Sequence, residues 1–126
     1  MYARVSDFQV PLEKLAAFTE AAHSVIPLIH KEAGFRALLV LKTPGSPALA
    51  RVVSVWESLE HLKASEKSMF LYQALSRVMA FTKGFPIMEE SEVLVSTFAG
   101  AASAPPAPRT VSDEDTQEIR TKDLPR

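Results

Sequence analysis

The stretch "RVVSVWESLEHLKASEKSMF", residues 51–70, decides the fold. A strand pattern ends at Trp56, and Ser58 follows in a position suited to capping the start of a helix. The helical pattern runs through Lys67, and Ser68 resembles a second N-cap that opens another helix. We therefore expect a strand over 50–57, a helix over 59–67 and a second helical piece over 69–82.

The first half of the chain shows the same order of elements. A strand pattern covers 2–8, and Pro11 is well placed to begin a helix whose apolar residues recur at three- and four-residue steps through 12–33. Gly34 ends that helix, a strand follows over 35–42, and "TPGSP" supplies a turn. With a last strand over 91–98, the order predicts an α+β ferredoxin-like βαββαβ fold, with a four-stranded antiparallel sheet and both helices on one face.

The central strands are apolar on both faces. Strict alternation places Leu38 and Val40 on one face of the sheet and gives the other face to Phe35, Ala37, Leu39 and Leu41. Two helices can cover only one face, and exposed apolar surface costs about 25 cal/mol per Å². We therefore expect a homodimer through the sheet face, which closes a dimeric α/β barrel.

The charge and composition of the chain exclude several classes of protein. The net charge is −1, and residues 1–98 hold ten basic and ten acidic side chains, so no basic surface for nucleic acid is indicated. No apolar run is long enough to span a membrane, and the N-terminus lacks the pattern of a signal peptide. The chain has no cysteine, which excludes disulfides and thiolate chemistry. We expect a cytoplasmic protein.

The composition changes after Phe98. Residues 99–126 are rich in Pro and Ala and then charged, with few side chains that could form a core. We expect a folded domain over 1–98 and a disordered tail over 99–126.

Two stretches resemble one known family. "VSVWES" followed by "ASEKSMF", and "IPLIHKEAGFRALLVL" earlier in the chain, are similar to the antibiotic biosynthesis monooxygenase family. The resemblance covers residues 1–98 and implies a dimeric α+β barrel. Members include oxygenases that oxidise polycyclic phenols without metal or flavin, and haem-degrading enzymes.

This chain departs from the characteristic motif of each of these two branches. The haem-degrading branch carries an Asn, a Trp and a His where this chain has Asp7, Ser65 and Leu75, so the resemblance implies no haem chemistry. The cofactor-free oxygenases carry a Trp at the position of Trp56, with an Asn four residues earlier. That earlier position is Val52 here, which cannot bind a substrate oxygen.

The candidate site residues have two readings each. Trp56 is either a core residue or a pocket wall, and Phe70, Met69 and Tyr72 either fill the core or line a pocket beside it. Arg36 either binds an anionic group or forms an ion pair, for example with Asp7 of a second copy. His23 is either a general base or an ordinary histidine at the border of the helix's apolar stripe. Because His23 and His30 lie about 10.5 Å apart along a helix, one metal ion cannot bridge them, and no metal site is expected.

These observations favour a cofactor-independent monooxygenase that acts on an aromatic or quinol-like small molecule. In this reading Trp56 positions the rings, His23 removes a proton, and the substrate carbanion reduces oxygen directly without any cofactor. The alternative is a non-catalytic module that binds a small ligand or has a purely structural role. A pocket filled by Phe70, Met69 and Leu75 would favour the alternative.

Overall fold

The computed structural model describes residues 1–99, and residues 1–94 form one compact unit. The tail predicted for 99–126 falls outside the described residues, apart from Ala99. In chain order the elements are β1 (Tyr2–Val10), a 3-10 turn (Leu12–Lys14), α1 (Leu15–Ile29), β2 (Phe35–Thr43), β3 (Ala48–Trp56), α2 (Leu59–Lys67), α3 (Phe70–Val78), a second 3-10 turn (Met79–Phe81) and β4 (Ile87–Glu92).

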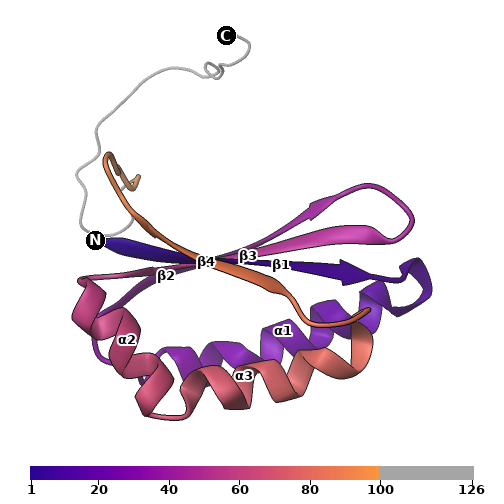
Figure 1. Ribbon diagram of the computed structural model, residues 1–126, viewed down its shortest axis with the longest axis horizontal. Coiled ribbons are helices and arrows are strands. Elements are labelled where there is room, and N and C mark those ends of the chain that lie inside the picture. Colours follow the sequence, from indigo (N-terminus) through magenta and orange to yellow (C-terminus); the bar gives the residue numbers. More distant parts are fainter. Residues whose placement is uncertain (100–126) are drawn as a thin grey trace, which may run out of the picture. The chain divides into compact units, whose positions relative to one another are not determined.

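The four strands form one antiparallel sheet in the order β2-β3-β1-β4. Helices α1 and α3 pack side by side beneath one face, and α2 lies at one end of the sheet (Figure 1). This is the predicted α+β ferredoxin-like arrangement, and the ends of the two central strands pair as Tyr2 with Trp56.

The last strand lies earlier in the chain than its sequence predicts. β4 covers Ile87–Glu92, whereas the apolar alternation favoured 91–98. Pairing with β1 sets the position, because β1 starts at Tyr2 and the final bond runs from the amide of Val93 to the carbonyl of Met1. The charged sequence of β4 is typical of an edge strand, where acidic side chains reach water.

The two serine caps differ in outcome. The Ser58 hydroxyl accepts a hydrogen bond from the His61 amide at 3.1 Å, which confirms the cap of α2. The prediction that Ser68 caps the start of the next helix was wrong. Ser68 closes α2, and Met69, with φ 71°, occupies the N-cap position of α3. The Ser68 hydroxyl instead donates to the Glu32 carboxylate at 2.6 Å.

A bulge in β2 changes the predicted faces of the sheet. Phe35 pairs with Trp56 and Ala37 pairs with Val55, so Arg36 is an extra residue between them. The bulge turns Phe35 toward the helices, where its ring lies 5.8 Å from that of Trp56. Strict alternation had placed Phe35 on the opposite face, and that expectation was wrong.

The core between sheet and helices has two parts. The first cluster of buried residues comprises Phe8, Val10, Phe18, Ala50 and Val78. The second comprises Val25, Ile29, Trp56, Leu62 and Phe70. Residues of both clusters meet near the middle of the sheet.

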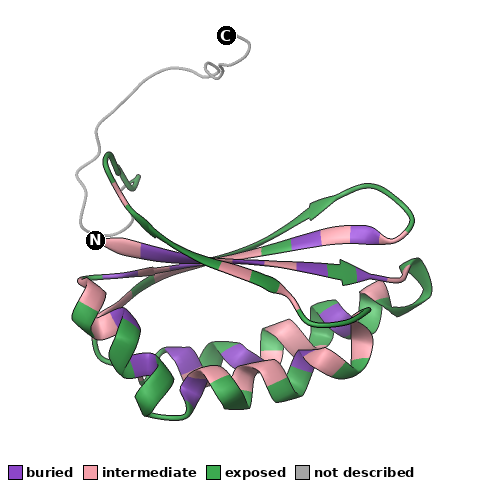
Figure 2. Ribbon diagram, viewed as in Figure 1, coloured by how far each residue is buried: buried purple, intermediate pink, exposed green. Residues whose placement is uncertain are grey.

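The opposite face of the sheet carries no helix within the compact unit, as Figure 2 shows. By strand register its apolar residues are Ala3, Val5, Ala37, Leu39, Leu41, Leu49, Val53, Val55 and Ile87. Leu39 is 56% exposed and Ile87 is 71% exposed. We refer to this surface as the open sheet face. Among the described helices, none is both long enough and apolar enough to cross a bilayer.

Candidate functional site

A cavity of about 70 Å³ lies between the sheet and the helices, at the junction of the two core clusters. We call it the inner cavity. Its apolar lining residues are Phe8, Phe18, Ala22, Val25, Ile29, Leu38, Val40, Val52, Phe70, Leu71, Ala74, Leu75 and Val78. A water molecule takes up about 30 Å³ of liquid volume, so the inner cavity holds roughly two waters or one small polar group.

Three polar side chains complete the lining of the inner cavity. They are Arg4 and Ser6 from β1 and Ser54 from β3, and all three are buried. Arg4 pairs with Ser54 in the strand register, and Ser6 lies two residues further along the same face. The inner cavity is therefore apolar except for one polar wall built on the central strands.

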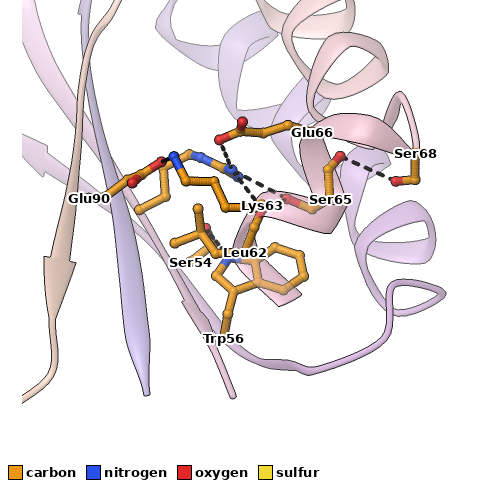
Figure 3. A network of polar contacts seen from close by, with 9 residues as sticks. Ser54, Trp56, Leu62, Lys63, Ser65, Glu66, Ser68 and Glu90 are labelled. Carbon is orange, nitrogen blue, oxygen red and sulfur yellow. Dashed lines mark hydrogen bonds and ion pairs between the residues drawn. The ribbon is translucent and has the colours of Figure 1, made fainter. Parts of the chain in front are cut away.

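The Arg4 guanidinium is held by α2. Its Nη2 donates to the Leu62 carbonyl at 3.2 Å, the Ser65 hydroxyl at 3.3 Å and the Glu66 carboxylate at 3.0 Å (Figure 3). The side chain of Arg4 is 5% exposed and that of Glu66 is 38% exposed. This charge is fixed in place by packing and by three acceptors, which is the arrangement that a buried cation requires.

Trp56 lies in the core beside the inner cavity rather than in its wall. Its ring is fully buried and makes edge contacts with Phe35 and with Phe70, the latter at 6.3 Å between ring centroids. The indole N–H donates to the Ser54 hydroxyl at 3.0 Å, as Figure 3 shows. Trp56 can therefore affect the inner cavity through Ser54 and Phe70, both of which line it.

A larger groove of about 340 Å³ adjoins the inner cavity between α1 and β2. We call it the outer groove. The two spaces share four lining residues, which are Phe18, Ala22, Leu38 and Val40. The remaining lining residues of the outer groove are Leu15, Thr19, His23, Ile26, Leu41, Lys42 and Ala50. The predicted base His23 thus lies in the outer groove, with its side chain exposed.

The remaining predicted site residues do not gather in one place. Phe70 lines the inner cavity, but Tyr72 is 67% exposed and Met69 is 53% exposed, and neither lines it. Arg36 is exposed at the bulge and lies 3.5 Å from the Glu57 carboxylate. The structure brings only Phe70 and, indirectly, Trp56 to the inner cavity.

Asp7 has a partner within its own chain. Arg51 Nε donates to the Asp7 carboxylate at 2.7 Å across β1 and β3, and Nη2 donates at 3.0 Å. These hydrogen bonds hold the pKa of Asp7 below its ordinary value. This pair lies on the open sheet face, and the expected pairing of Asp7 with Arg36 of a second copy stays a prediction.

Sequence reasoning missed the polar wall of the inner cavity. Arg4 stands in a strand between apolar neighbours, on the helix-facing side defined by Tyr2, Ser6 and Phe8, and that position was the available signal. Its partners in α2 lie about sixty residues away in the chain, so spacing alone could not identify them. Within residues 1–99, no three His, Asp or Glu side chains converge as metal ligands would.

Comparisons with known proteins agree with the fold. The sequence profile of the antibiotic biosynthesis monooxygenase family matches residues 1–74. Among curated proteins, none matches the sequence.

Solved structures with this fold come from several bacteria. A protein from Bordetella bronchiseptica, named as a candidate antibiotic biosynthesis monooxygenase, is 14% identical with a TM-score of 0.66 over 75% of this chain and 97% of that one. A Nitrosomonas europaea protein of unknown function is 18% identical with a TM-score of 0.66 over 79% and 95% of the two chains. A Bacteroides thetaiotaomicron protein of unknown function, named as a candidate oxidoreductase, is 20% identical with a TM-score of 0.59 over 73% and 97%. The profile match covers more than half of the chain, and the chain therefore belongs to the antibiotic biosynthesis monooxygenase family.

Proposed function

We propose that this protein is a cofactor-independent monooxygenase acting on an aromatic, quinol-like small molecule. One observation carries the proposal: the apolar inner cavity has a single polar wall, formed by Arg4, Ser6 and Ser54. A fixed cation in an apolar site lowers the cost of forming an oxygen anion, because the stabilising charge needs no reorganisation when the anion appears. Family membership adds support from the chemistry of related oxygenases.

The proposed reaction needs only a proton acceptor and dioxygen. A base removes a proton from an acidic phenol or from the CH₂ group of an anthrone, and the resulting carbanion transfers electrons to O₂. A new C–O bond forms, the O–O bond breaks, and the CH₂ group becomes a carbonyl while the second oxygen atom leaves as water.

Two residues have proposed roles in that reaction. His23 in the outer groove is the candidate base, and its exposed ring can exchange the proton with solvent. Trp56 acts as a positioning residue, because its indole fixes the Ser54 hydroxyl and its ring contacts Phe70. The polar wall would then hold the oxygen at which negative charge collects.

Oxygen uptake tests the proposal directly. The protein is mixed with a panel of anthrones and naphthols in buffer containing a metal chelator, and O₂ is followed with an electrode. We expect consumption of one O₂ per substrate above the rate without protein, and a strong loss in Ser54→Ala. Ser76→Ala, an exposed serine on α3, is the matched control and should keep full activity. Uptake equal to the protein-free rate for every compound would contradict the proposal.

A second candidate function is a non-catalytic module that binds a small ligand. The size of the inner cavity favours it, because about 70 Å³ is too small for an aromatic ring while a cavity of about 150 Å³ accepts benzene. Saturable binding of a panel compound without oxygen uptake would support this function over the enzymatic one.

We also propose that the protein is a homodimer joined through the open sheet face. The two central strands place Val5, Val53 and Val55 there, and a monomer would leave these side chains and the more exposed Leu39 facing water. A second copy related by a two-fold axis would cover the same residues on both protomers. Sedimentation analysis of the full chain tests this proposal, and a monomer at micromolar concentration would contradict it.

A further inference from the structure

We propose that the substrate is an aromatic anion, with its carboxylate or phenolate oxygen at Arg4 in the inner cavity and its rings in the outer groove. The inference concerns the same site as the proposed function and rests on it for the reaction. The mode of binding itself can be tested without any turnover.

The sizes of the two spaces determine how a ligand can lie. The inner cavity, about 70 Å³, accepts a carboxylate or a single oxygen but no ring, whereas the outer groove, about 340 Å³, accepts a bicyclic ring system. The two spaces share four lining side chains and therefore adjoin. The proposed binding mode requires that one elongated molecule pass between these side chains and occupy both spaces. Of these four residues Ala22 has the smallest side chain, so enlarging it is a direct test of the passage.

The free donors of Arg4 indicate what binds in the inner cavity. A guanidinium has five N–H groups, and within residues 1–99 all hydrogen bonds of Arg4 leave from Nη2. Nε and Nη1 therefore retain three N–H donors on a side chain that is 5% exposed. Buried donors of this kind are normally paired, and a ligand oxygen would pair them.

The two serines reinforce the preference for an acceptor. The Ser54 hydroxyl accepts from Trp56, so its own O–H stays free to donate toward a ligand. Ser6 makes no side-chain hydrogen bond within the described residues and is 6% exposed. A cavity wall with these donors and a buried positive charge selects an oxygen anion over a neutral amide or an amine.

The charge in the outer groove also favours an anionic ligand. Lys42 is the charged side chain in its lining, and no carboxylate accompanies it. Glu66 opposes anion binding most directly, because it pairs with Arg4 at 3.0 Å from the partly exposed side of α2. Glu89 and Glu90 of β4 line a surface pocket together with Arg4 and Glu66, and they oppose it from further away. Removing that carboxylate should leave more of the Arg4 charge available to a ligand.

The first experiment compares 1-naphthoate with its neutral counterpart 1-naphthamide. Binding to the full chain is measured by calorimetry and by fluorescence of Trp56, the only tryptophan. We expect naphthoate to bind at least tenfold more tightly than naphthamide, and Glu66→Gln to tighten naphthoate further. The double variant Arg4→Met/Glu66→Gln, which removes both members of the ion pair, should lose most of the preference for naphthoate, and only the part due to Lys42 should remain. Equal affinities in the wild type, or no binding of either probe, would overturn the inference.

The second experiment tests the passage between the two spaces. Ala22→Phe and, separately, Val40→Phe should each weaken naphthoate binding at least tenfold by filling the shared wall. Ala17→Phe, an exposed alanine on the same helix, is the control and should leave binding unchanged. Unchanged binding in two folded wall variants would overturn the inference. Naphthoate binding that follows this pattern, together with no oxygen uptake for any substrate, would leave the binding mode intact and reject the monooxygenase.

Discussion

The indole N–H of Trp56 donates to the Ser54 hydroxyl at 3.0 Å, although the two residues lie two positions apart on one strand face. This bond satisfies the only polar atom of the most deeply buried large side chain in the core. The same hydroxyl lines the inner cavity, so the core and the candidate site share one polar atom.

Replacing either partner of that bond should destabilise the fold. We expect Trp56→Phe to lower the free energy of unfolding by about 2 kcal/mol, through lost volume and a lost hydrogen bond. Ser54→Ala should cost about 1–3 kcal/mol, because it leaves the indole N–H buried and unpaired. Urea denaturation followed by circular dichroism measures both, and the double variant should cost less than the sum of the two. Additive costs would show that the hydrogen bond contributes nothing.

Gly34 and Gly84 have nearly the same backbone angle, φ 83° and 81°, but different surroundings. A Cβ at Gly34 would meet the His61 ring, whereas a Cβ at Gly84 would meet nothing within 4 Å. In each alanine variant the left-handed conformation should lower the free energy of unfolding by roughly 1–2 kcal/mol. Gly34→Ala should lower the melting temperature more than Gly84→Ala does, and an equal decrease in both variants would contradict the contact with His61.

Met69 combines a left-handed backbone with a 53% exposed side chain. Met69→Gly removes the steric cost of that conformation, and we expect the melting temperature to stay the same or rise. Binding of 1-naphthoate should not change, because Met69 lines neither the inner cavity nor the outer groove. A tenfold loss of binding in this variant would restore Met69 to the candidate site.

The open sheet face offers a matched pair for testing the dimer. Leu39 on that face is 56% exposed, and Leu12, in the 3-10 turn before α1, is 55% exposed. Leu39→Lys should shift sedimentation to the monomer, since it places a charge in the proposed interface. Leu12→Lys should leave the mass unchanged, and the same shift in both variants would contradict the interface.

Acid should weaken the pair of Asp7 and Arg51. The pKa of Asp7 is lowered in the folded chain because Arg51 donates hydrogen bonds to its carboxylate. The pair therefore stabilises the folded state above the unfolded pKa near 4, and that contribution is lost as the pH falls through the folded pKa. Both side chains are partly exposed, so water screens the pair and the effect on stability should be small.

An NMR titration of the Asp7 carboxyl carbon measures this pKa. In Arg51→Gln the value should rise toward that of an ordinary aspartate, and the dependence of stability on pH below about 4 should become shallower. An unchanged pKa in the variant would show that Arg51 does not set it.

Local patterns in the sequence predicted most of the fold. Alternation placed β1, β2 and β3, the three- and four-residue steps placed α1, and Ser58 marked the start of α2. They failed where distant partners decide the outcome. β4 ends at Glu92 because β1 begins opposite it at Tyr2, and nothing in "IMEESE" itself indicates a strand.

The candidate site was harder to predict than the fold. Aromatic side chains near Trp56 suggested a pocket, yet Tyr72 lies on the exposed side of α3. Burial of Arg4 depends on acceptors in α2 that only the packing of that helix brings close. A single sequence shows which side chains are polar, but it does not show which of them the fold encloses.

The bulge at Arg36 adds one residue to β2 without changing the register on either side of it, because Phe35 pairs with Trp56 and Ala37 pairs with Val55. Deleting that residue would leave Phe35 and Ala37 as neighbours on opposite faces of the sheet, which is the alternation of a regular strand. Phe35 would keep its place beside Trp56, and Leu38 and Val40 would stay in the cavity wall. Related sequences should therefore tolerate the loss of this residue, whereas a deletion later in β2 would exchange the two faces of the strand.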